Sequence, residues 1–252
     1  MPDNRLKPQM GYSLMTYLVH CDRGQVLEFL PKGLKIAEVG VLAGDYSNFL
    51  LKRAQPASLT LIDSWQHHDD PNYARDGANS ENAIQETRYH QVRNRFYDQI
   101  AEGTITIIRD LSVNALSQIP PNSMDFVYID AMHYEDAVLA DLHAAAEAVS
   151  DDGILAGHDF CNHVQARRSN FGVIAAVKAF CAATGYKLIM ITQETWPSYY
   201  LAKPGAELAR TFMQGIFTSP HEMVGFDDAL IDRVRQKVIP LADGEKTVTW
   251  VS

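Results

Sequence analysis

Cysteine is scarce in this sequence. The 252 residues include three cysteines, Cys21, Cys161 and Cys181, and no two of them have C-x-x-C spacing. A small, odd number of widely spaced thiols argues against a disulfide framework and against a cysteine-ligated zinc site. We therefore expect reduced thiols.

Long apolar runs are also missing. No uninterrupted apolar stretch approaches the roughly 18 residues that a membrane-spanning helix needs. The first residues, 1–7, have no apolar core of a signal peptide. These absences predict a cytoplasmic protein without a membrane partner.

Positive charge is in deficit. Lys and Arg total 22 against 31 Asp and Glu, which gives a formal net charge of -9. Because nucleic-acid phosphates call for a basic surface, this balance disfavours a nucleic acid as partner. A small molecule or a sugar is the expected partner. The hydrophobic share of 46% and the charged share of 21% are typical of a globular chain with one large domain and an appendage.

The chain alternates between strand-like and helix-like segments. The expected strands are 34–40, 58–63, 104–109, 124–130, 154–157, 186–191 and 198–202. Only a few residues around Trp196 and Pro197 separate the last two, too few for the crossover that parallel neighbours need. We therefore predict an α/β fold: a Rossmann-like, mostly parallel seven-stranded sheet with a C-terminal antiparallel hairpin strand and helices on both faces.

The first two strands carry a nucleoside-binding pattern. One ends in Glu38-x-Gly40-x-x-x-Gly44, a helix follows, and the next strand ends on Asp63. Dinucleotide sites need a second glycine where this chain has Leu42, because the backbone must approach a pyrophosphate there. S-adenosylmethionine (SAM) has no phosphate, and it needs a tight turn and an acid for its ribose hydroxyls. SAM is therefore favoured, and a nicotinamide-dependent oxidoreductase is the alternative.

Four blocks, together with the terminal hairpin, resemble the class I SAM-dependent methyltransferases. They are Ala37–Gly44, Leu61–Trp65, Tyr128–Glu135 and Gly157–Phe160. The resemblance covers about residues 34–203 and is to the Methyltransf_24 type, related to the catechol and macrolide-sugar O-methyltransferases. It implies SAM contacts from Glu38 and Gly40 at the methionine end, Gly44 in the same turn, Asp63 at the ribose, Ser64 and Trp65 beside the adenosine, and Asp110, Leu111 and Ser112 at the adenine. As alternatives, Trp65 is a core aromatic residue, and Asp110 and Ser112 cap the short helix that follows.

Polar residues at two later strand ends predict the chemistry. Asp130 ends the fourth expected strand and Asp159 the fifth, so both should face the methyl donor at the carboxyl edge of the sheet. His133 stands where the related catechol enzymes carry a lysine base, and an imidazole can take a hydroxyl proton near neutral pH. We therefore expect methyl transfer to a hydroxyl of a small metabolite or sugar, with His133, Asp130 and His158 as catalytic residues. The alternative for His133 is a structural role that braces the next helix.

The same resemblance raises the expectation of a metal ion. The related enzymes hold Mg²⁺ through an acid on the fourth strand and an acid followed by Asn or Asp after the fifth. This chain keeps Asp130 and Asp159 but has Phe160 at the third position. Two converging carboxylates without a cation would repel each other, so Mg²⁺ on Asp130 and Asp159 is slightly favoured over a metal-free site in which His133 and His158 do the acid–base work. The run from His67 to Asp70 suits a solvated lid better than a ligand cluster.

The two ends of the chain lie outside the resemblance. We expect an N-terminal helical cap over 1–33, a SAM-binding methyltransferase domain over 34–204, and a C-terminal extension over 205–252 that packs on the domain or on a partner subunit. A helix is expected around 229–238. Either end could form a substrate lid or a homodimer contact. A catalytically silent SAM-binding protein is the remaining alternative. The apolar residues expected on the N-terminal helix are Leu14, Leu18, Leu27 and Phe29.

Overall fold

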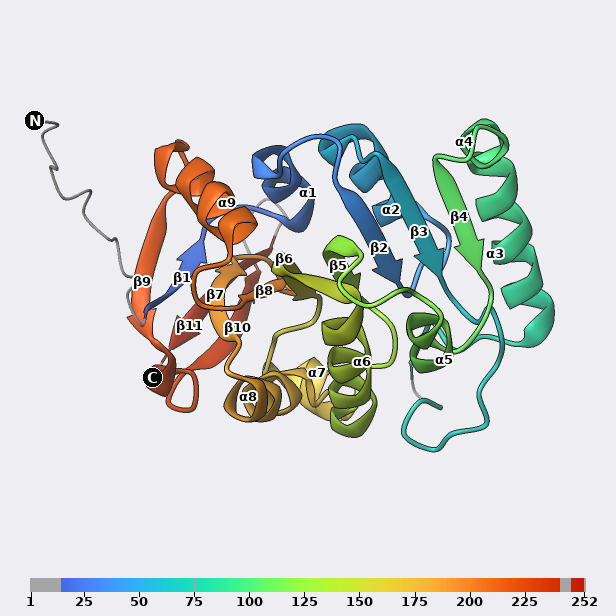
Figure 1. The fold of residues 1–252 in the computed structure, drawn as a ribbon. Coiled ribbons are helices and arrows are strands. Elements are labelled where there is room, and N and C mark those ends of the chain that lie inside the picture. Colours follow the sequence, from blue (N-terminus) through green and yellow to red (C-terminus); the bar gives the residue numbers. More distant parts are fainter. Residues whose placement is uncertain (1–14, 75, 241–245, 252) are drawn as a thin grey trace, which may run out of the picture.

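The computed structural model describes residues 15–74, 76–240 and 246–251 (Figure 1). The strands of its main sheet are β1 Met15–Val19, β2 Lys35–Val39, β3 Ser58–Ile62, β4 Ile105–Ile108, β5 Met124–Ile129, β6 Val149–Gly157, β7 Lys187–Thr192, β8 Tyr199–Ala202 and β9 Met223–Asp227. They lie in the order β4, β3, β2, β5, β6, β8, β7, β1, β9. Strands β10 (Arg235–Pro240) and β11 (Lys246–Val251) pair with each other in a second, antiparallel sheet.

The main sheet confirms the predicted α/β fold with its antiparallel hairpin strand. Strands β4, β3, β2, β5 and β6 run parallel to one another, whereas β8 runs antiparallel between β6 and β7. The main sheet has nine strands among the described residues, not the seven expected. The difference arises because β1 pairs with β7 and β9 pairs with β1, which extends the sheet beyond the hairpin.

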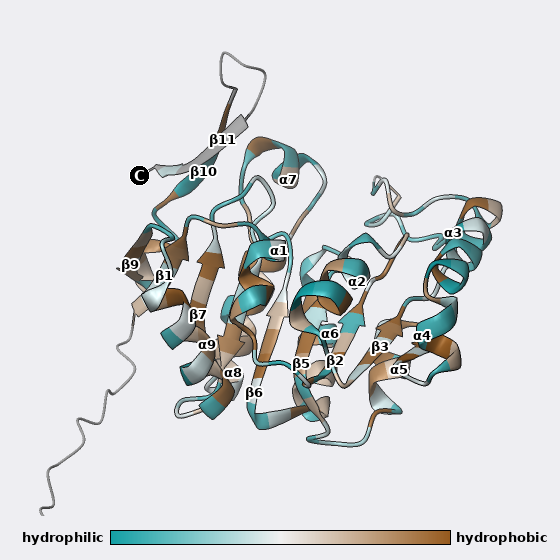
Figure 2. Ribbon diagram, turned by 90° about the horizontal axis from the view of Figure 1, so that it is seen from above, coloured by the Kyte–Doolittle hydropathy of each residue, from teal (hydrophilic) through white to brown (hydrophobic). Residues whose placement is uncertain are grey.

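Helices cover both faces of the sheet, and each face has its own apolar core. In Figure 2 the apolar strands lie between helices whose hydrophilic residues face outward. On α8 (Val173–Thr184), Val173, Ala176, Val177 and Phe180 are all buried, which is the spacing of one face of a helix. One core includes residues of α1 (Arg23–Val26), α2 (Asp45–Phe49), α3 (Asn82–Arg95) and α9 (Glu207–Thr218), with α4 (Tyr97–Ala101) beside it. The other includes residues of α5 (Ser112–Ser117), α6 (Glu135–Ala148) and α8 (Val173–Thr184), and α7 (Val164–Arg168) lies between β6 and α8.

The helix expected around 229–238 is wrong, and the expected N-terminal helix is present only as a short helical segment over 23–29. Leu18 lies in β1, and helical structure near it is limited to α1 and a 3-10 turn that contains Leu27 and Phe29. Leu14 lies outside the described residues. Around 229–238 the chain forms a 3-10 turn and then β10, whose Val238 pairs with Val248. In both cases strand pairing supplies the backbone hydrogen bonds: β1 pairs with the distant β7, and β10 pairs with β11, the next strand along the chain. Helical periodicity does not reveal such a partner.

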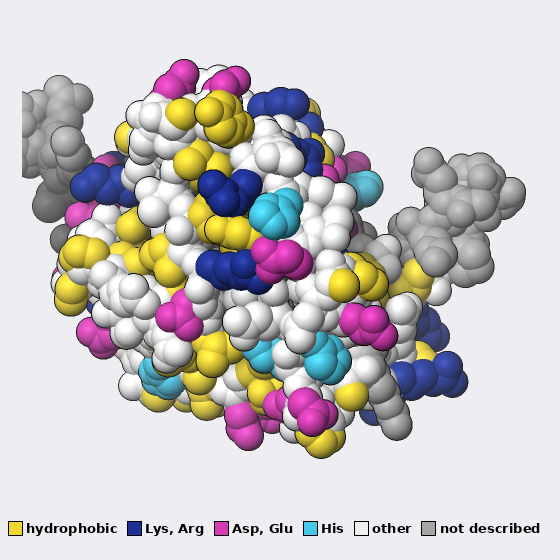
Figure 3. All heavy atoms as spheres, turned by 90° about the vertical axis from the view of Figure 1, so that its right-hand side faces the viewer, with side chains coloured by type: hydrophobic (Ala, Val, Ile, Leu, Met, Phe, Trp, Pro, Cys, Tyr) yellow, Lys and Arg dark blue, Asp and Glu magenta, His cyan; other side chains and the backbone are white. Residues whose placement is uncertain are grey.

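Charges of both signs are interspersed on the face beside α3. Figure 3 shows dark blue, magenta and cyan side chains side by side there. The ion pairs formed by residues of α3 include those of Arg109 with Glu86, of His90 with Glu86 and of Arg95 with Asp45. Within the described part of the chain, no helix is both long and apolar enough to span a membrane.

Candidate active site

A cavity of about 400 Å³ lies where β2, β3, β5 and β6 end. This is the edge at which open α/β sheets bind their ligands. The residues predicted from the sequence that line it are Glu38, Gly40, Asp63, Ser64, Leu111, Ser112, Asp130, His133, His158 and Asp159. Gly44, Trp65 and Asp110 were also predicted but are not among its lining residues.

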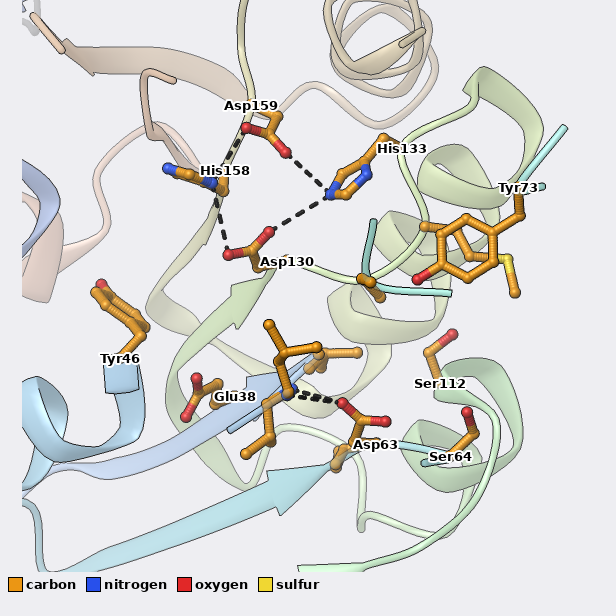
Figure 4. Close-up of a pocket in the computed structure, with 18 of the residues that line it drawn as sticks. Glu38, Tyr46, Asp63, Ser64, Tyr73, Ser112, Asp130, His133, His158 and Asp159 are labelled. Atoms are coloured by element: carbon orange, nitrogen blue, oxygen red, sulfur yellow. Dashed lines mark hydrogen bonds and ion pairs between the residues drawn. The ribbon is translucent and has the colours of Figure 1, made fainter. Parts of the chain in front are cut away.

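Asp63 organises the glycine turn at one end of the cavity. Its Oδ2 accepts hydrogen bonds from the backbone N–H groups of Val41 and Leu42, both at 2.9 Å (Figure 4). Its Oδ1 accepts one from the N–H of Trp65 at 2.7 Å. A carboxylate has about four lone-pair positions, so this arrangement leaves a place for one further donor. The sequence predicts a contact of Asp63 with the ribose hydroxyls, and the structure adds its contacts with the turn.

Trp65 supports the turn from outside the cavity. Its side chain is 1% exposed, and its indole N–H donates to the carbonyl oxygen of Leu42 at 2.9 Å. The ring also packs against Tyr89, with 5.1 Å between the ring centroids. This burial favours the core interpretation of Trp65 over a contact with adenosine. Gly44 lies in the same turn with φ of +79°, and a Cβ there would come within 2.9 Å of the Phe96 ring.

The loop after β4 divides between the cavity and helix α5. Asp110 accepts hydrogen bonds from the N–H of Leu111 at 2.7 Å and from the Asn114 amide at 3.2 Å, so it braces the first turn of α5. Ser112 lines the cavity, and its hydroxyl donates to Asp141 at 2.5 Å. Leu111 also lines the cavity and is 45% exposed.

Glu38 is the penultimate residue of β2, lines the cavity and is almost fully buried. The hydroxyl of Ser47 donates to its Oε2 at 2.5 Å. Burial raises the pKa of Glu38 to about 8, although the Ser47 hydrogen bond opposes the shift. The carboxyl is therefore mostly protonated at neutral pH, and a cationic ligand beside it would favour the ionised form.

At the other end of the cavity, two aspartates and two histidines form one cluster (Figure 4). His133 Nε2 lies 2.9 Å from Asp159 Oδ2 and 3.5 Å from Asp130 Oδ1. His158 Nδ1 lies 3.2 Å from Asp159 Oδ1 and 3.5 Å from Asp130 Oδ2. Each histidine thus bridges the two carboxylates. The sequence prediction that Asp130 and Asp159 converge is confirmed by these distances.

Mutual pairing sets the charge of this cluster. Burial opposes the charge on both histidines, but the surrounding carboxylates raise the pKa of His158 to about 9 and that of His133 well above its usual value. Burial likewise opposes ionisation of the aspartates, yet the histidines lower the pKa of Asp159 to about 2 and help to hold that of Asp130 well below its usual range. All four groups are therefore charged at neutral pH.

Two further charged residues contact the cluster and were not predicted from the sequence. Arg23 of α1 places a guanidinium nitrogen 2.7 Å from Asp130 Oδ2 and lies over the ring of Tyr46. Asp76, from the polar insert over 64–80, lies 2.6 Å from His133 Nδ1. Arg23 falls outside the resembling blocks, and Asp76 falls in an insert without periodicity, so neither carried a local signal.

An aromatic wall borders the same end of the cavity. The ring of Phe171 stacks on His133 with 4.4 Å between centroids, and Trp196 packs against Phe171 at 5.4 Å. Phe171, Trp196 and Tyr73 all line the cavity. This wall gives the site an apolar surface beside its charged groups.

The residues at the first end of the cavity fit SAM. A cavity of 400 Å³ lies within the range of roughly 300–1,000 Å³ usual for small-molecule sites. Asp63 keeps one acceptor position for a hydroxyl, and buried Glu38 can gain an ionic partner from a cationic ligand. Leu42 lines the cavity where a pyrophosphate would need a glycine, which disfavours a dinucleotide.

The donor set of the cluster does not fit Mg²⁺. One ligand atom each from Asp130, His133 and Asp159 lie within 4.8 Å of one another. The third atom is an imidazole nitrogen, whereas Mg²⁺ prefers oxygen ligands. Repulsion between Asp130 and Asp159 is also a weaker reason to expect a bound cation. The carboxylates of Asp76, Asp130 and Asp159 are balanced by three cationic side chains, those of Arg23, His133 and His158.

The run His67–Asp70 lies in the insert beside the cavity and does not converge as a ligand set. His68 Nε2 lies 3.0 Å from the Ser64 hydroxyl, whereas Asp70 accepts a hydrogen bond from the Tyr134 hydroxyl at 3.0 Å. These contacts hold the insert against the domain. They agree with the interpretation of this run as structural.

Comparison with known proteins gives one family match and several similar structures. Residues 37–160 match the model of a methyltransferase domain, the Methyltransf_24 family. A SAM-dependent methyltransferase from Aquifex aeolicus has a similar structure, with a TM-score of 0.50, 13% identity, and coverage of 71% of this chain and 89% of that one. A putative rRNA methylase from Clostridium thermocellum gives a TM-score of 0.49 at 12% identity, with coverage of 71% and 92%. The spermidine synthase of Thermotoga maritima gives 0.48 at 12% identity, with coverage of 84% and 67%.

The search among curated proteins gave no match. The family match covers the glycine turn, Asp63 and the strand ends that carry Asp130 and Asp159. The similar structure shows the same fold for the larger part of the chain. The chain therefore has a Rossmann-like methyltransferase fold, and its residues 37–160 match a methyltransferase domain.

Proposed function

We propose that the protein transfers a methyl group from SAM to a hydroxyl of a small metabolite or sugar. The single observation that carries this proposal is that one cavity joins the turn around Gly40 and Asp63 to the cluster around Asp130 and His133. A cofactor at the first end and an acceptor at the second would meet inside it. SAM, when bound, supplies a methyl group on a positively charged sulfur.

The residues at the first end divide the work of holding SAM. Asp63 fixes the turn through Val41 and Leu42 and offers one acceptor position to a ribose hydroxyl. Glu38 lies at the end assigned to the methionine portion, where a cationic ligand favours its ionised form. Ser64, Leu111 and Ser112 line the part of the cavity assigned to the adenosine.

His133 is the proposed base at the second end. His133 lines the cavity, its Nε2 lies beside Asp130 and Asp159, and its Nδ1 shares a hydrogen bond with Asp76. In the ionised cluster His133 carries a proton, so it must lose this proton before it can accept one from the acceptor hydroxyl. A hydroxyl that enters the cluster can donate to a carboxylate or to a neutral imidazole, which orients its oxygen for attack.

The acceptor class follows from the two kinds of surface at this end. Paired carboxylates and imidazoles suit a polyhydroxylated molecule, because each hydroxyl can donate to or accept from them. Phe171 and Trp196 offer flat apolar faces for ring carbons. A small hydroxylated ring, such as a sugar, is the acceptor that uses both.

Product formation tests this function. The purified protein is incubated with SAM and a panel of sugars and small polyols, and the demethylated cofactor and methylated acceptor are quantified. We expect stoichiometric formation of both, and a loss of at least about a hundredfold in His133→Gln, because a general base contributes about 10²- to 10⁴-fold. His90→Gln is the matched control, because His90 lies on the outer face of α3 with 59% of its side chain exposed.

The alternatives give distinct results. SAM binding without product from any acceptor would indicate a catalytically silent SAM-binding protein. Binding of NADH in place of SAM would indicate the oxidoreductase. Full activity of His133→Gln would remove His133 as the base and leave the methyl transfer intact.

A further inference from the structure

His133 is held on three sides, and one of the contacts comes from a distant insert. Its ring stacks on Phe171, and its Nε2 lies beside Asp159. Its Nδ1 lies 2.6 Å from Asp76 Oδ2, and the two side chains are only 14% and 13% exposed. Because a carboxylate can only accept, Nδ1 carries the proton of this hydrogen bond. Asp76 lies 57 positions before His133 in the chain and is not among the residues that line the cavity.

Asp76 is itself fixed in the insert. Its other oxygen, Oδ1, accepts a hydrogen bond from the N–H of Ala78 at 2.8 Å. The carbonyl oxygen of Ala78 in turn accepts hydrogen bonds from Gln85 and Arg88 of α3, at 2.9 and 2.8 Å. The Asp76 carboxylate is therefore anchored to α3 through Ala78 on one side and contacts His133 on the other.

We propose that Asp76 is a positioning residue that holds the His133 ring with Nδ1 protonated and Nε2 directed at the acceptor end of the cavity. This inference rests on the proposed role of His133 as the base. It assigns to the insert over 64–80 the task of completing the active site.

The physical reason is the two distinct nitrogens of imidazole. A neutral ring carries one proton. Nδ1 shares a hydrogen bond with Asp76 at 2.6 Å, whereas Nε2 lies near Asp159 and Asp130 without an aligned hydrogen bond, so the proton stays on Nδ1 and the Nε2 lone pair is free. Without the carboxylate, the ring can rotate or adopt the other tautomer, and its lone pair then points away from the acceptor. Serine hydrolases use a buried aspartate in the same way behind their catalytic histidine.

A purely structural role for Asp76 is the competing explanation, and the chain offers a matched control for it. Tyr134, next to His133, donates its hydroxyl to Asp70 Oδ2 of the same insert at 3.0 Å. Tyr134→Phe removes a hydrogen bond between the insert and the domain without touching the imidazole. Asp76→Asn keeps the shape of residue 76. If its one oxygen stays with the N–H of Ala78, its NH₂ group faces Nδ1 and replaces the acceptor there with a donor.

The first measurement needs no acceptor. In the full-length protein labelled with ¹⁵N-histidine, the proton on His133 Nδ1 should give a low-field resonance, identified by its loss in His133→Gln. We expect Asp76→Asn to abolish or strongly shift this resonance, and Tyr134→Phe to keep it. A missing low-field resonance in the wild type, or an unchanged one in Asp76→Asn, would overturn the proposal even if the protein proves to be an active methyltransferase.

The second measurement uses the acceptor found by the product screen. We expect Asp76→Asn to lower kcat by about a hundredfold with KM within twofold, Asp76→Glu to recover part of the loss, and Tyr134→Phe to stay within about threefold of wild type, as positioning behind a general base implies. Equal losses in Asp76→Asn and Tyr134→Phe, or a wild-type kcat in Asp76→Asn, would show that the contact only anchors the insert. If no acceptor is turned over, the proposed function fails, and the resonance alone decides the placement of His133 by Asp76.

Discussion

The backbone carbonyl oxygen of Asp130 lies directly against Gly40. A Cβ at residue 40 would come within 1.9 Å of that oxygen, and the φ of Gly40 is +89°. The N–H of Asp130 also donates to the carbonyl oxygen of Val39 at 2.7 Å, so the ends of β2 and β5 are joined at this point. Gly40 is thus required by the packing of two strand ends, in addition to any requirement of the cofactor.

Replacement of Gly40 should therefore lower stability as well as SAM affinity. In Gly40→Ala the unfavourable φ alone costs about 1–3 kcal/mol, and the overlap with Asp130 adds to that loss. Urea unfolding without SAM should show a clear fall in the midpoint. Gly77→Ala is the control, because a Cβ at Gly77 meets nothing within 4 Å. Wild-type stability of Gly40→Ala would show that the strand ends separate more easily than this packing implies.

The second prediction concerns Asp63. In Asp63→Asn the charge is lost. Both oxygens of Asp63 accept hydrogen bonds from backbone N–H groups in the wild type, so the amide N–H₂ of the variant must face one of these donors. Affinity for SAM should fall by about 1.5–3 kcal/mol, the usual value of a hydrogen bond to a charged group. Titration calorimetry measures it. Asp110→Asn should retain affinity, because Asp110 does not line the cavity. A loss of SAM affinity in Asp110→Asn would instead support the predicted contact of Asp110 with the adenine.

The features of this fold that could be predicted from the sequence are those that depend on local patterns. The glycine turn, Asp63 and the strand ends at Asp130 and Asp159 each follow an apolar segment, and parallel topology brings such ends to one edge. The antiparallel β8 followed from the short link before it. The added strand β1 could not be foreseen in this way, because its partner β7 lies far along the chain and strand pairing leaves no local spacing signal.

Site residues divide in the same way. His133 was found because it follows Asp130 by three positions, whereas Asp76 and Arg23 reach the cluster from segments with no pattern of their own. Their presence also changes the charge argument. Sequence alone showed two converging carboxylates, and the structure adds the cations that pair with them.

The third prediction concerns the pH dependence of stability. The pKa of Glu38 is raised by burial to about 8 from an ordinary value of 4.5. Between these values the folded state binds a proton that the unfolded state has lost, so this group's contribution to stability is complete below the lower value. It falls as pH rises towards the higher one, by at most about 1.4 kcal/mol per pH unit.

Glu38→Gln isolates this effect. The amide cannot ionise, so the difference in unfolding free energy between the variant and the wild type should move in favour of the variant from pH 5 to pH 8. Comparing the two proteins cancels the contributions of His133 and His158, which titrate in both. A constant difference across this range would show that Glu38 is ionised in the folded protein throughout.

The last prediction concerns the metal and the base together. Because Arg23, His133 and His158 already balance the carboxylates, we expect turnover to persist in chelator and to gain little from added Mg²⁺. The pKa of His133 is raised by its carboxylate partners, so at neutral pH only a small fraction of the imidazole is free to accept a proton. Turnover should therefore rise with pH, by about tenfold per unit below that pKa, and then level off.

A divalent cation would change each of these results. If one is needed, it lowers the pKa of the acceptor hydroxyl by direct coordination. Chelator would then abolish turnover, Mg²⁺ or another divalent ion would restore it, and Asp159→Ala would cost as much as Asp130→Ala. Loss in chelator with recovery on adding metal would therefore refute the metal-free site. Turnover that persists in chelator but does not change with pH would instead refute His133 as the base, because a base with a raised pKa must lose its proton before it can act.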